Sequence, residues 1–312
     1  RNFKKLKNKS QNLILPVNPK KILTSLSPFK NELFKFWLAF KEKKFKLYIF
    51  QHGGEVGQRK CNNDYIKHSV AISDKFFSWG FQRSDLPKIK KFYSNVFSNE
   101  NLITENKKKK YDILIVLPPL RRYMSQITTG VVLPGFMLFE FINRIKLLIN
   151  FFEKKKNLLF PNKNLNIAVK LHPGTFEDGS NPGHNIETLF QKTHYDIYYE
   201  QKSLKELASN SRLVLHTYEG TPFFETCKLK INSIMLLPDF HNQMIYGKFK
   251  KIYNNLMKDS VIINNNSLYK IEDIINNDVR LYSKKSTFRY LEKFCKTTNN
   301  YENKLETLLN GK

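Results

Sequence analysis

The sequence predicts an α/β fold built on a doubly wound parallel sheet, and three observations support this. Short apolar runs alternate with helical stretches along most of the 312 residues, as expected for strands joined by crossover helices. Several runs, such as Ile113–Leu117, are apolar at consecutive positions, which is typical of strands covered on both faces. Polar residues follow the ends of these runs, where open parallel sheets bind ligands. A chain of this length is expected to form two domains.

The first domain is expected to comprise residues 1–105. It is interpreted as a partial α/β domain, because the chain starts at Arg1 rather than Met and we expect an N-terminal portion to be missing. Its predicted elements are helical patches between Asn31 and Lys43, a strand Phe45–Phe50 and a second strand His68–Ser73. The polar, Lys-rich segment Asn99–Lys110 is predicted to link the two domains.

The second domain is expected to span residues 106–312 and to end in helices that close it. Its predicted strands are Ile113–Leu117, Ile167–Leu171, Asp196–Tyr199, Leu213–His216, Ser233–Leu237 and Val261–Asn264. Its predicted helices are Pro134–Lys156, Leu204–Ser209, one that begins at Pro222, Leu268–Asn276 and Phe288–Leu309. This alternation is that of a Rossmann-like, doubly wound domain.

The chain is strongly basic, with 53 Lys and Arg against 27 Asp and Glu and a net charge of +26. Such an excess suits nucleic acid, an anionic membrane surface or small anionic ligands, and Lys-rich codon usage explains it equally well. Residues 1–50 hold 13 Lys or Arg and two Glu, which favours an anionic membrane. No nucleic-acid-binding module is recognisable, so nucleic acid is not an expected partner.

The chain has three cysteines, Cys61, Cys227 and Cys295. Their odd number and wide spacing predict neither a disulfide framework nor a structural zinc site, and suit a reducing cytoplasm. The longest apolar stretch, Val131–Phe152, carries three charged residues, so it is predicted to be an amphipathic helix packed on a sheet rather than a membrane span. We therefore expect a cytoplasmic protein that associates peripherally with the inner membrane.

The segment His216–Glu225 is the most informative for chemistry. Thr221 followed by Pro222 predicts a helix start with Thr221 as N-cap, whose N–H groups and dipole would favour a phosphate. Glu225 follows four residues later on the same face, where its carboxylate would accept hydrogen bonds from a ribose diol. An ordinary capped helix with an acidic first turn explains the same residues equally well.

Two other strand ends carry candidate anion ligands. Arg121 and Arg122 follow the first strand of the second domain and would clamp a diphosphate or a sugar carboxylate, although a solvated basic loop is the simpler interpretation. Lys170 and His172 end the next strand, two residues apart and hence on one side. His172 would reach a phosphate; the alternative is a structural histidine before a turn-forming proline.

The loop Gln51-His52-Gly53-Gly54-Glu55 is the candidate catalytic segment. Its two glycines let the backbone approach a ligand closely. His52 is the candidate general base, because histidine titrates near working pH, and Glu55 is a second titratable group; the alternative is a loop histidine with no catalytic role. The sequence has no DxD triad, Walker A pattern or GxGxxG, so we expect no metal and no cofactor.

In this order, the QHGG loop, ISDKFFSWGF (72–81), LPPLRRY (117–123), KLHP (170–173) and LHTYEGTPFFETCKLKINSIMLL (215–237) resemble a family of surface-carbohydrate transferases. This family is distantly similar to capsule Kdo transferases and CDP-glycerol-type polymerases. The resemblance covers roughly residues 45–240. It implies a GT-B-like fold of two Rossmann-like domains, with the donor nucleotide held by the second.

By that resemblance Thr221 and Glu225 match the donor-binding segment, Lys170 and His172 line the cleft and His52 faces the donor. Thr217, Glu219 and Gly220 are further candidate donor-binding residues because they directly follow a predicted strand. The implied function is a glycosyltransferase with a nucleotide sugar as substrate and a glycan or lipid-linked acceptor. Alternatives on the same fold are a polyol-phosphate transferase and a nucleotide-sugar epimerase. A basic nucleic-acid-binding protein and an inactive homologue are alternatives of a different class.

Overall fold

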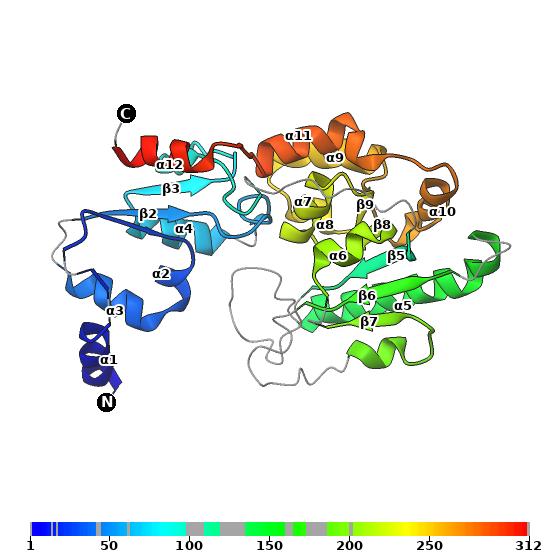
Figure 1. Cartoon of the computed structure of the whole chain (residues 1–312), viewed down its shortest axis with the longest axis horizontal. Helices are drawn as coiled ribbons and strands as arrows, with labels where there is room; N and C mark the ends of the chain where they lie inside the picture. Colours follow the sequence, from blue (N-terminus) through cyan, green and yellow to red (C-terminus); the bar gives the residue numbers. More distant parts are fainter. Residues whose placement is uncertain are drawn as a thin grey trace. The chain divides into compact units, whose positions relative to one another are not determined.

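The computed structural model describes residues 2–13, 15–16, 18–41, 45–60, 63–97, 109–118, 135–159, 165–172, 186–199 and 202–310 (Figure 1). The chain divides into two compact units: unit 1 contains Arg1–Asn99 and Glu292–Lys312, and unit 2 contains Glu100–Leu291. This division differs from the expected one at the C-terminus, where the last helix belongs to unit 1. The predicted linker Asn99–Lys110 lies mostly outside the described residues.

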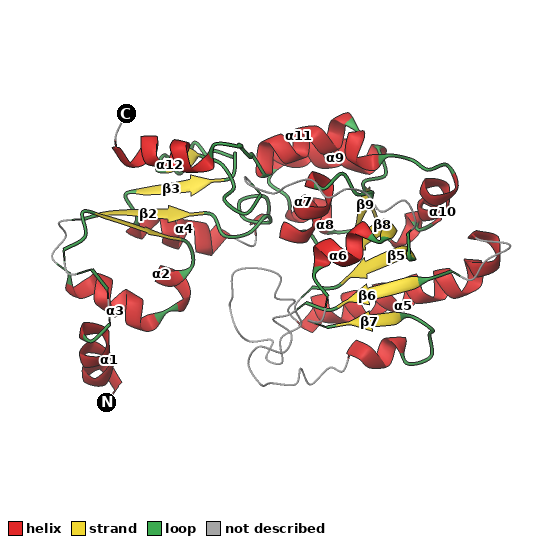
Figure 2. Ribbon diagram, viewed as in Figure 1, coloured by secondary structure: helices red, strands yellow, loops and turns green. Residues whose placement is uncertain are grey.

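Unit 1 is built on a four-stranded parallel sheet (Figure 2). Its strands, in spatial order, are β1 (Lys21–Thr24), β2 (Lys46–Phe50), β3 (Lys75–Ser78) and β4 (Ile89–Lys91). Its helices are α1 (Asn2–Gln11), α2 (Ser27–Lys30), α3 (Glu32–Phe40), α4 (Asn63–Ile72) and α12 (Tyr301–Asn310). The predicted strand 45–50 and helix 31–43 are confirmed as β2 and α3.

Helices cover both faces of this sheet because β3 presents alternate aromatic side chains to each face. Phe77 belongs to a cluster with Tyr48 and Phe92, against which Tyr301 and three leucines of α12 pack. Phe76 meets Tyr65 of α4 edge to face, at 6.3 Å between ring centroids. Aromatic side chains therefore pack on both faces of this small sheet.

Two predicted elements of the N- and C-terminal segments are wrong. Residues 68–73 were expected to be a strand, but they end helix α4, because burial at 65, 66, 69 and 70 follows the helical period. The expected helix 288–309 is two helices, α11 (Lys285–Phe294) and α12. The chain breaks where Lys296 pairs through its backbone, donating to the Trp79 carbonyl and accepting from the Ser94 N–H, both at 2.7 Å.

Unit 2 contains a six-stranded parallel sheet of order β10-β9-β8-β5-β6-β7. Its strands are β5 (Tyr111–Val116), β6 (Ile167–Lys170), β7 (Asp196–Tyr198), β8 (Ser211–His216), β9 (Ser233–Leu236) and β10 (Ile262–Ile263). The strand order reverses between β5 and β8, as in doubly wound nucleotide-binding folds. The predicted strands and the doubly wound plan of this unit are confirmed.

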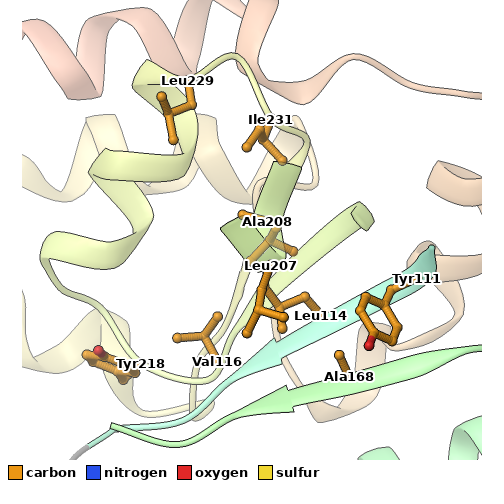
Figure 3. Packing of buried hydrophobic residues seen from close by; sticks show 10 residues of the cluster. Tyr111, Leu114, Val116, Ala168, Leu207, Ala208, Tyr218, Leu229 and Ile231 are labelled. Atoms are coloured by element: carbon orange, nitrogen blue, oxygen red, sulfur yellow. The ribbon is translucent and has the colours of Figure 1, made fainter. Parts of the chain in front are cut away.

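Seven helices of the described residues connect or flank these strands. They are α5 (Gly135–Leu159), α6 (Leu204–Ser209), α7 (Thr221–Lys228), α8 (His241–Met244), α9 (Lys250–Lys258), α10 (Tyr269–Asn276) and α11, with 3-10 turns at Ile186–Phe190, Gly247–Phe249, Asn265–Ser267 and Leu281–Ser283. Figure 3 shows β5 residues Leu114 and Val116 packed with Leu207 and Ala208 of α6. The crossover from β5 through α5 to β6 and the crossover from β7 through α6 to β8 run in opposite directions along the sheet. Because such crossovers are right-handed, α5 and α6 lie on opposite faces of the sheet.

Helix α5 is the amphipathic helix predicted from the long apolar stretch. Its buried face includes Phe141, Ile145, Leu148 and Phe152, each fully covered, at the spacing of one helical face. No helix within the described residues is both long enough and apolar enough to cross a membrane.

Candidate functional site

Unit 2 has a pocket of about 350 Å³ at the carboxyl edge of its sheet. This is the edge where parallel sheets bind ligands, and the pocket lies beside the reversal between β5 and β8. Its lining residues are Val116 and Leu117 at the end of β5, Lys170, Leu171 and His172 at the end of β6, Lys202, Ser203 and Leu204 at the start of α6, and Tyr218, Pro222 and Glu225 around the start of α7. The pocket therefore combines apolar walls with a few charged groups, as ligand pockets do.

Three of the predicted donor residues line this pocket. Lys170 is 6% exposed and His172 is half-buried, and both end β6. Glu225 lies in the second turn of α7 and lines the same pocket. Arg121 and Arg122 lie outside the described residues.

Helix α7 begins at Thr221, one residue earlier than predicted, and its N-cap is Gly220. Thr221 is thus not the N-cap, because the backbone turns into the helix at the glycine. A side chain at Gly220 would lie 2.9 Å from the Tyr218 ring, so the loop needs a residue without Cβ. A glycine cap also has no side chain to compete with a bound anion for the N–H groups of the first turn.

The polar groups of Thr217 hold the strand end in place. Its N–H and its hydroxyl both donate to the Val116 carbonyl, at 3.0 and 2.9 Å, which ties the end of β8 to the end of β5. The residue is 1% exposed. Thr217 therefore positions the loop that carries Tyr218 and Gly220.

Glu219 lies in a buried polar cluster. Its carboxylate is 1% exposed, accepts a hydrogen bond from the Tyr290 hydroxyl at 2.9 Å and lies 3.4 Å from Nε2 of His241. Tyr290 belongs to α11 and His241 to α8, so side chains of two helices meet the loop before α7 at this residue. The cluster fixes the loop before α7 from behind.

His216 forms a second buried network beneath α7. Its Nε2 lies 3.0 Å from the Thr226 hydroxyl, and that hydroxyl also accepts from Ser233 at 2.8 Å. The Thr226 hydroxyl also lies 3.2 and 3.1 Å from the carbonyl oxygens of Pro222 and Phe223. Burial lowers the pKa of His216 from 6.5 to about 3, which keeps the ring neutral.

The candidate catalytic loop of unit 1 is held by Gln51. Its amide donates to the Gly53 carbonyl and accepts from the Trp79 N–H, both at 2.7 Å, and Gln51 is 2% exposed. Gly53 and Gly54 are buried, Glu55 is half-buried and His52 is exposed. The loop therefore presents His52 to solvent from a fixed backbone.

A residue that the sequence analysis did not single out as functional is Arg144 of α5. It is 5% exposed, and its Nη2 donates to the Thr217 carbonyl at 3.4 Å. Tyr218 and the apolar pocket walls were also missed. The sequence does indicate that Arg144 is unusual, because it lies on the apolar face of a predicted helix, where charged residues are rare unless they are paired.

No three His, Cys, Asp or Glu side chains among the described residues are grouped as a metal site would require. Cys227 and Cys295 are buried cysteines that form no disulfide. The side chains that line the pocket of unit 2 are therefore cationic, carboxylate and apolar.

The structure is similar to GT-B enzymes that handle nucleotide sugars. It matches the UDP-GlcNAc 2-epimerase of Methanocaldococcus jannaschii at 14% identity with a TM-score of 0.53, covering 99% of this chain and 82% of that one. It matches Staphylococcus aureus TarM at 15% identity and TM-score 0.50, covering 89% and 52%, and pneumococcal O-GlcNAc transferase GtfA at 11% and 0.51, covering 98% and 59%. The chain thus spans about half the length of TarM, and the likeness establishes the GT-B fold.

No curated protein matches the sequence. The family model of the LIC12162 family transferases matches residues 1–258, which is most of the chain and includes both the unit 1 loop and the unit 2 pocket. The protein belongs to the LIC12162 family of transferases.

Proposed function

We propose that the protein is a glycosyltransferase that moves a sugar from a nucleotide-activated donor to a growing surface polysaccharide or a lipid-linked acceptor. The observation that carries this proposal is the pocket of unit 2. It brings a carboxylate, Glu225, to the same cavity as the start of α7 and the cation Lys170. These groups match the diol, the phosphates and the apolar base of a nucleotide.

The donor is proposed to bind with its nucleoside in this pocket. Leu171, Leu204 and Tyr218 offer apolar surface to the base, and Glu225 accepts hydrogen bonds from the ribose hydroxyls. The diphosphate then faces the first turn of α7, beside Lys170 and His172, where the helix dipole and the Lys170 ammonium group stabilise the leaving group. TarM and GtfA were both solved with UDP, which supports a nucleoside diphosphate as the activating group of the donor sugar.

His52 is proposed as the general base. It would take the proton from the acceptor hydroxyl as that oxygen bonds to the anomeric carbon, while the bond from this carbon to the diphosphate breaks. Glu55 is the second titratable group of the loop and lies against Gly53. Transfer is proposed to need no metal and no cofactor, so EDTA should leave activity unchanged, and a loss restored by Mg²⁺ would contradict this.

The acceptor is proposed to be presented at the cytoplasmic face of an anionic membrane. The supporting surface is α1 with α3, where Phe3 and Phe40 are 63% and 42% exposed and Lys4, Lys5 and Lys9 belong to the same helix as Phe3. Basic and aromatic side chains together suit an anionic lipid surface. Co-sedimentation with vesicles containing phosphatidylglycerol, but not with phosphatidylcholine vesicles, would support this.

A nucleotide-sugar epimerase is the second candidate, because the UDP-GlcNAc 2-epimerase of Methanocaldococcus jannaschii matches this structure with a TM-score of 0.53, both in the structure described above and in one with UDP-GlcNAc and UDP. The two functions differ in their need for an acceptor. An epimerase converts the sugar nucleotide alone, whereas a transferase forms a glycoside and releases the nucleotide.

A thermal-shift screen against CMP, CDP, UDP, GDP and ADP tests the proposed function. A nucleotide that binds the folded protein raises the melting temperature as its concentration passes the dissociation constant. A hit supports a nucleotide-dependent enzyme and identifies the base. If none of the five raises the melting temperature, the proposed donor site is wrong.

A further inference from the structure

Three lysines of unit 1 lie around the end of β4. Lys91 is the last residue of that strand, Lys293 lies in the last turn of α11, and Lys296 follows that helix. The segment after α11 contacts the chain that leaves β4, because the Ser94 N–H donates to the Lys296 carbonyl at 2.7 Å. The Lys296 ammonium group also lies 4.9 Å from the centre of the Tyr93 ring. Residues far apart in the chain thus form one lysine cluster, consisting of Lys91, Lys293 and Lys296.

The lysine cluster is electrostatically unfavourable unless an anion lies near it. None of its three ammonium groups forms an ion pair with a carboxylate of the described residues. Lys293 is half-buried, and its burial and the charge of Lys91 both lower its pKa. By contrast, Lys46 of the same unit is paired with Asp74. Like charges held together, one of them half-buried, indicate a site for an anion.

Backbone contacts hold the end of α11 against the loop that follows β3. Gly80 has φ +133, and a Cβ at this position would lie 2.8 Å from the Lys293 carbonyl oxygen, so the close approach requires glycine. The Trp79 carbonyl accepts a hydrogen bond from the Lys296 N–H at 2.7 Å. The fold therefore fixes the backbone of two of the three lysines beside the end of β4.

The lysine cluster lies at the same edge of the sheet as the His52 loop. Strands β2, β3 and β4 are parallel neighbours, so their carboxyl ends share the edge at which such sheets bind ligands. Because neighbouring strands lie about 5 Å apart, the ends of β2 and β4 are about 10 Å apart. Trp79 links the two places, since its carbonyl binds Lys296 and its N–H donates to the Gln51 side chain at 2.7 Å. A ligand that contacts the lysine cluster can thus also reach His52.

We propose that Lys91, Lys293 and Lys296 bind a phosphate or diphosphate group of the acceptor while the acceptor hydroxyl lies at His52. This inference rests on the proposed function and names the chemical class of its acceptor, a phosphorylated sugar that is either soluble or linked to a lipid. Phosphate oxygens carry the negative charge that the cluster lacks, and lysine ammonium groups bind them as point charges. The separation of about 10 Å between the strand ends leaves room for sugar between the phosphate and the reacting hydroxyl.

The test titrates inorganic pyrophosphate into the parent, Lys91→Met, Lys293→Met and the control Lys90→Met by calorimetry. Lys90 is exposed on the same strand, and its side chain points to the opposite face from that of Lys91, so the control removes the same charge from outside the cluster. Each protein is first saturated with the nucleotide that raises its melting temperature, so that pyrophosphate does not bind the pocket of unit 2. N-acetylglucosamine 1-phosphate and a polyprenyl diphosphate in phosphatidylcholine vesicles are then titrated to distinguish a soluble from a lipid-linked phosphate.

We expect Lys91→Met and Lys293→Met each to bind pyrophosphate roughly 3- to 10-fold more weakly than the parent, since partly exposed charge contacts contribute less than buried ones. The variant with both replacements should bind it more weakly still. Lys90→Met should bind pyrophosphate like the parent, and every variant should bind the nucleotide like the parent. The same losses with the sugar phosphate alone would identify a soluble acceptor, and the same losses with the vesicles a lipid-linked one.

Equal pyrophosphate affinity in Lys91→Met and the parent would overturn the inference. An equal loss in Lys91→Met and Lys90→Met would also overturn it, because that is the behaviour of a diffuse basic surface. A parent that binds a nucleotide but no pyrophosphate overturns the inference and leaves the proposed function standing. If no nucleotide binds, the titration is run without one, and a loss confined to the cluster variants supports the phosphate site while the proposed donor site fails. If Lys293→Met does not fold, Lys91→Met decides alone, because Lys91 is exposed on an edge strand.

Discussion

The buried histidine of β8 gives a quantitative prediction about acid stability. His216 is completely buried, and its pKa falls from 6.5 to about 3 because burial disfavours the charged ring. The unfolded chain therefore binds a proton near pH 6.5 that the folded protein does not bind until much lower pH. Stability linked to His216 is complete above the unfolded pKa and is lost as the pH falls below it.

The size of the effect follows from these two values. Between about pH 7.5 and about pH 5, His216 alone should reduce the free energy of unfolding of unit 2 by about 2 kcal/mol. Replacing it with leucine removes the titration and leaves Thr226 bonded to Ser233. His216→Leu should thus lose about 2 kcal/mol of the parent's pH dependence, whatever its own stability.

Urea unfolding followed by far-ultraviolet circular dichroism measures this. Tryptophan fluorescence does not serve, because Trp37 and Trp79 both lie in unit 1. Val214→Ala is the matched control: the residue is buried in the same strand, so its replacement should lower stability equally at both pH values. An NMR titration that finds His216 of the folded protein protonating near pH 6.5, or a His216→Leu variant with the full pH dependence of the parent, would refute the reasoning.

Three further predictions concern a ligand, a turn and a buried hydrogen bond. Glu225→Gln should bind the nucleotide found in the screen about 10- to 100-fold more weakly, and undiminished binding in calorimetry would remove Glu225 from the ribose site. Gly57→Ala should destabilise unit 1 by about 2–3 kcal/mol, because Gly57 has φ +85 and a Cβ there would lie 2.3 Å from the Phe81 ring; tryptophan fluorescence during urea unfolding measures it. Gly247→Ala, where a Cβ meets nothing within 4 Å, is the glycine control in unit 2, and it should change little when unfolding is followed by circular dichroism. Tyr290→Phe removes the hydroxyl that donates to the buried Glu219 carboxylate and should cost about 1–3 kcal/mol in differential scanning calorimetry, whereas an unchanged melting temperature would show that this bond contributes nothing.

The sequence predicted unit 2 better than unit 1 for a physical reason. The central strands β5 and β6 are buried at every position and apolar at all positions but one, and β8 has the buried apolar run Leu213–Leu215, so their signal is strong. The edge strand β4 has one buried residue in three, and β1 one in four. Such edge strands form because they pair with a neighbouring strand, and their own residues carry little apolar pattern. Strand pairing cannot be read from a single sequence.

The candidate site shows the same limit. The rule that ligands bind after parallel strands correctly brought Lys170 and His172 to one pocket with Glu225. That rule does not predict the contact of Arg144, which lies in the middle of a helix, with Thr217. It also does not predict the contact between Glu219 and Tyr290. These contacts join residues more than 70 positions apart, and only the fold decides that they meet.

The return of the chain to unit 1 has a consequence for its biosynthesis. The aromatic face formed by Tyr48, Phe77 and Phe92 is covered by Tyr301, Leu305 and Leu308 of α12, and all of unit 2 lies between them in the chain. On the ribosome, unit 2 can complete its core while this face of unit 1 still lacks its cover. Until α12 emerges, this exposed aromatic surface of the nascent chain is able to associate with other apolar surfaces. Docking of α12 covers it and completes the core of unit 1.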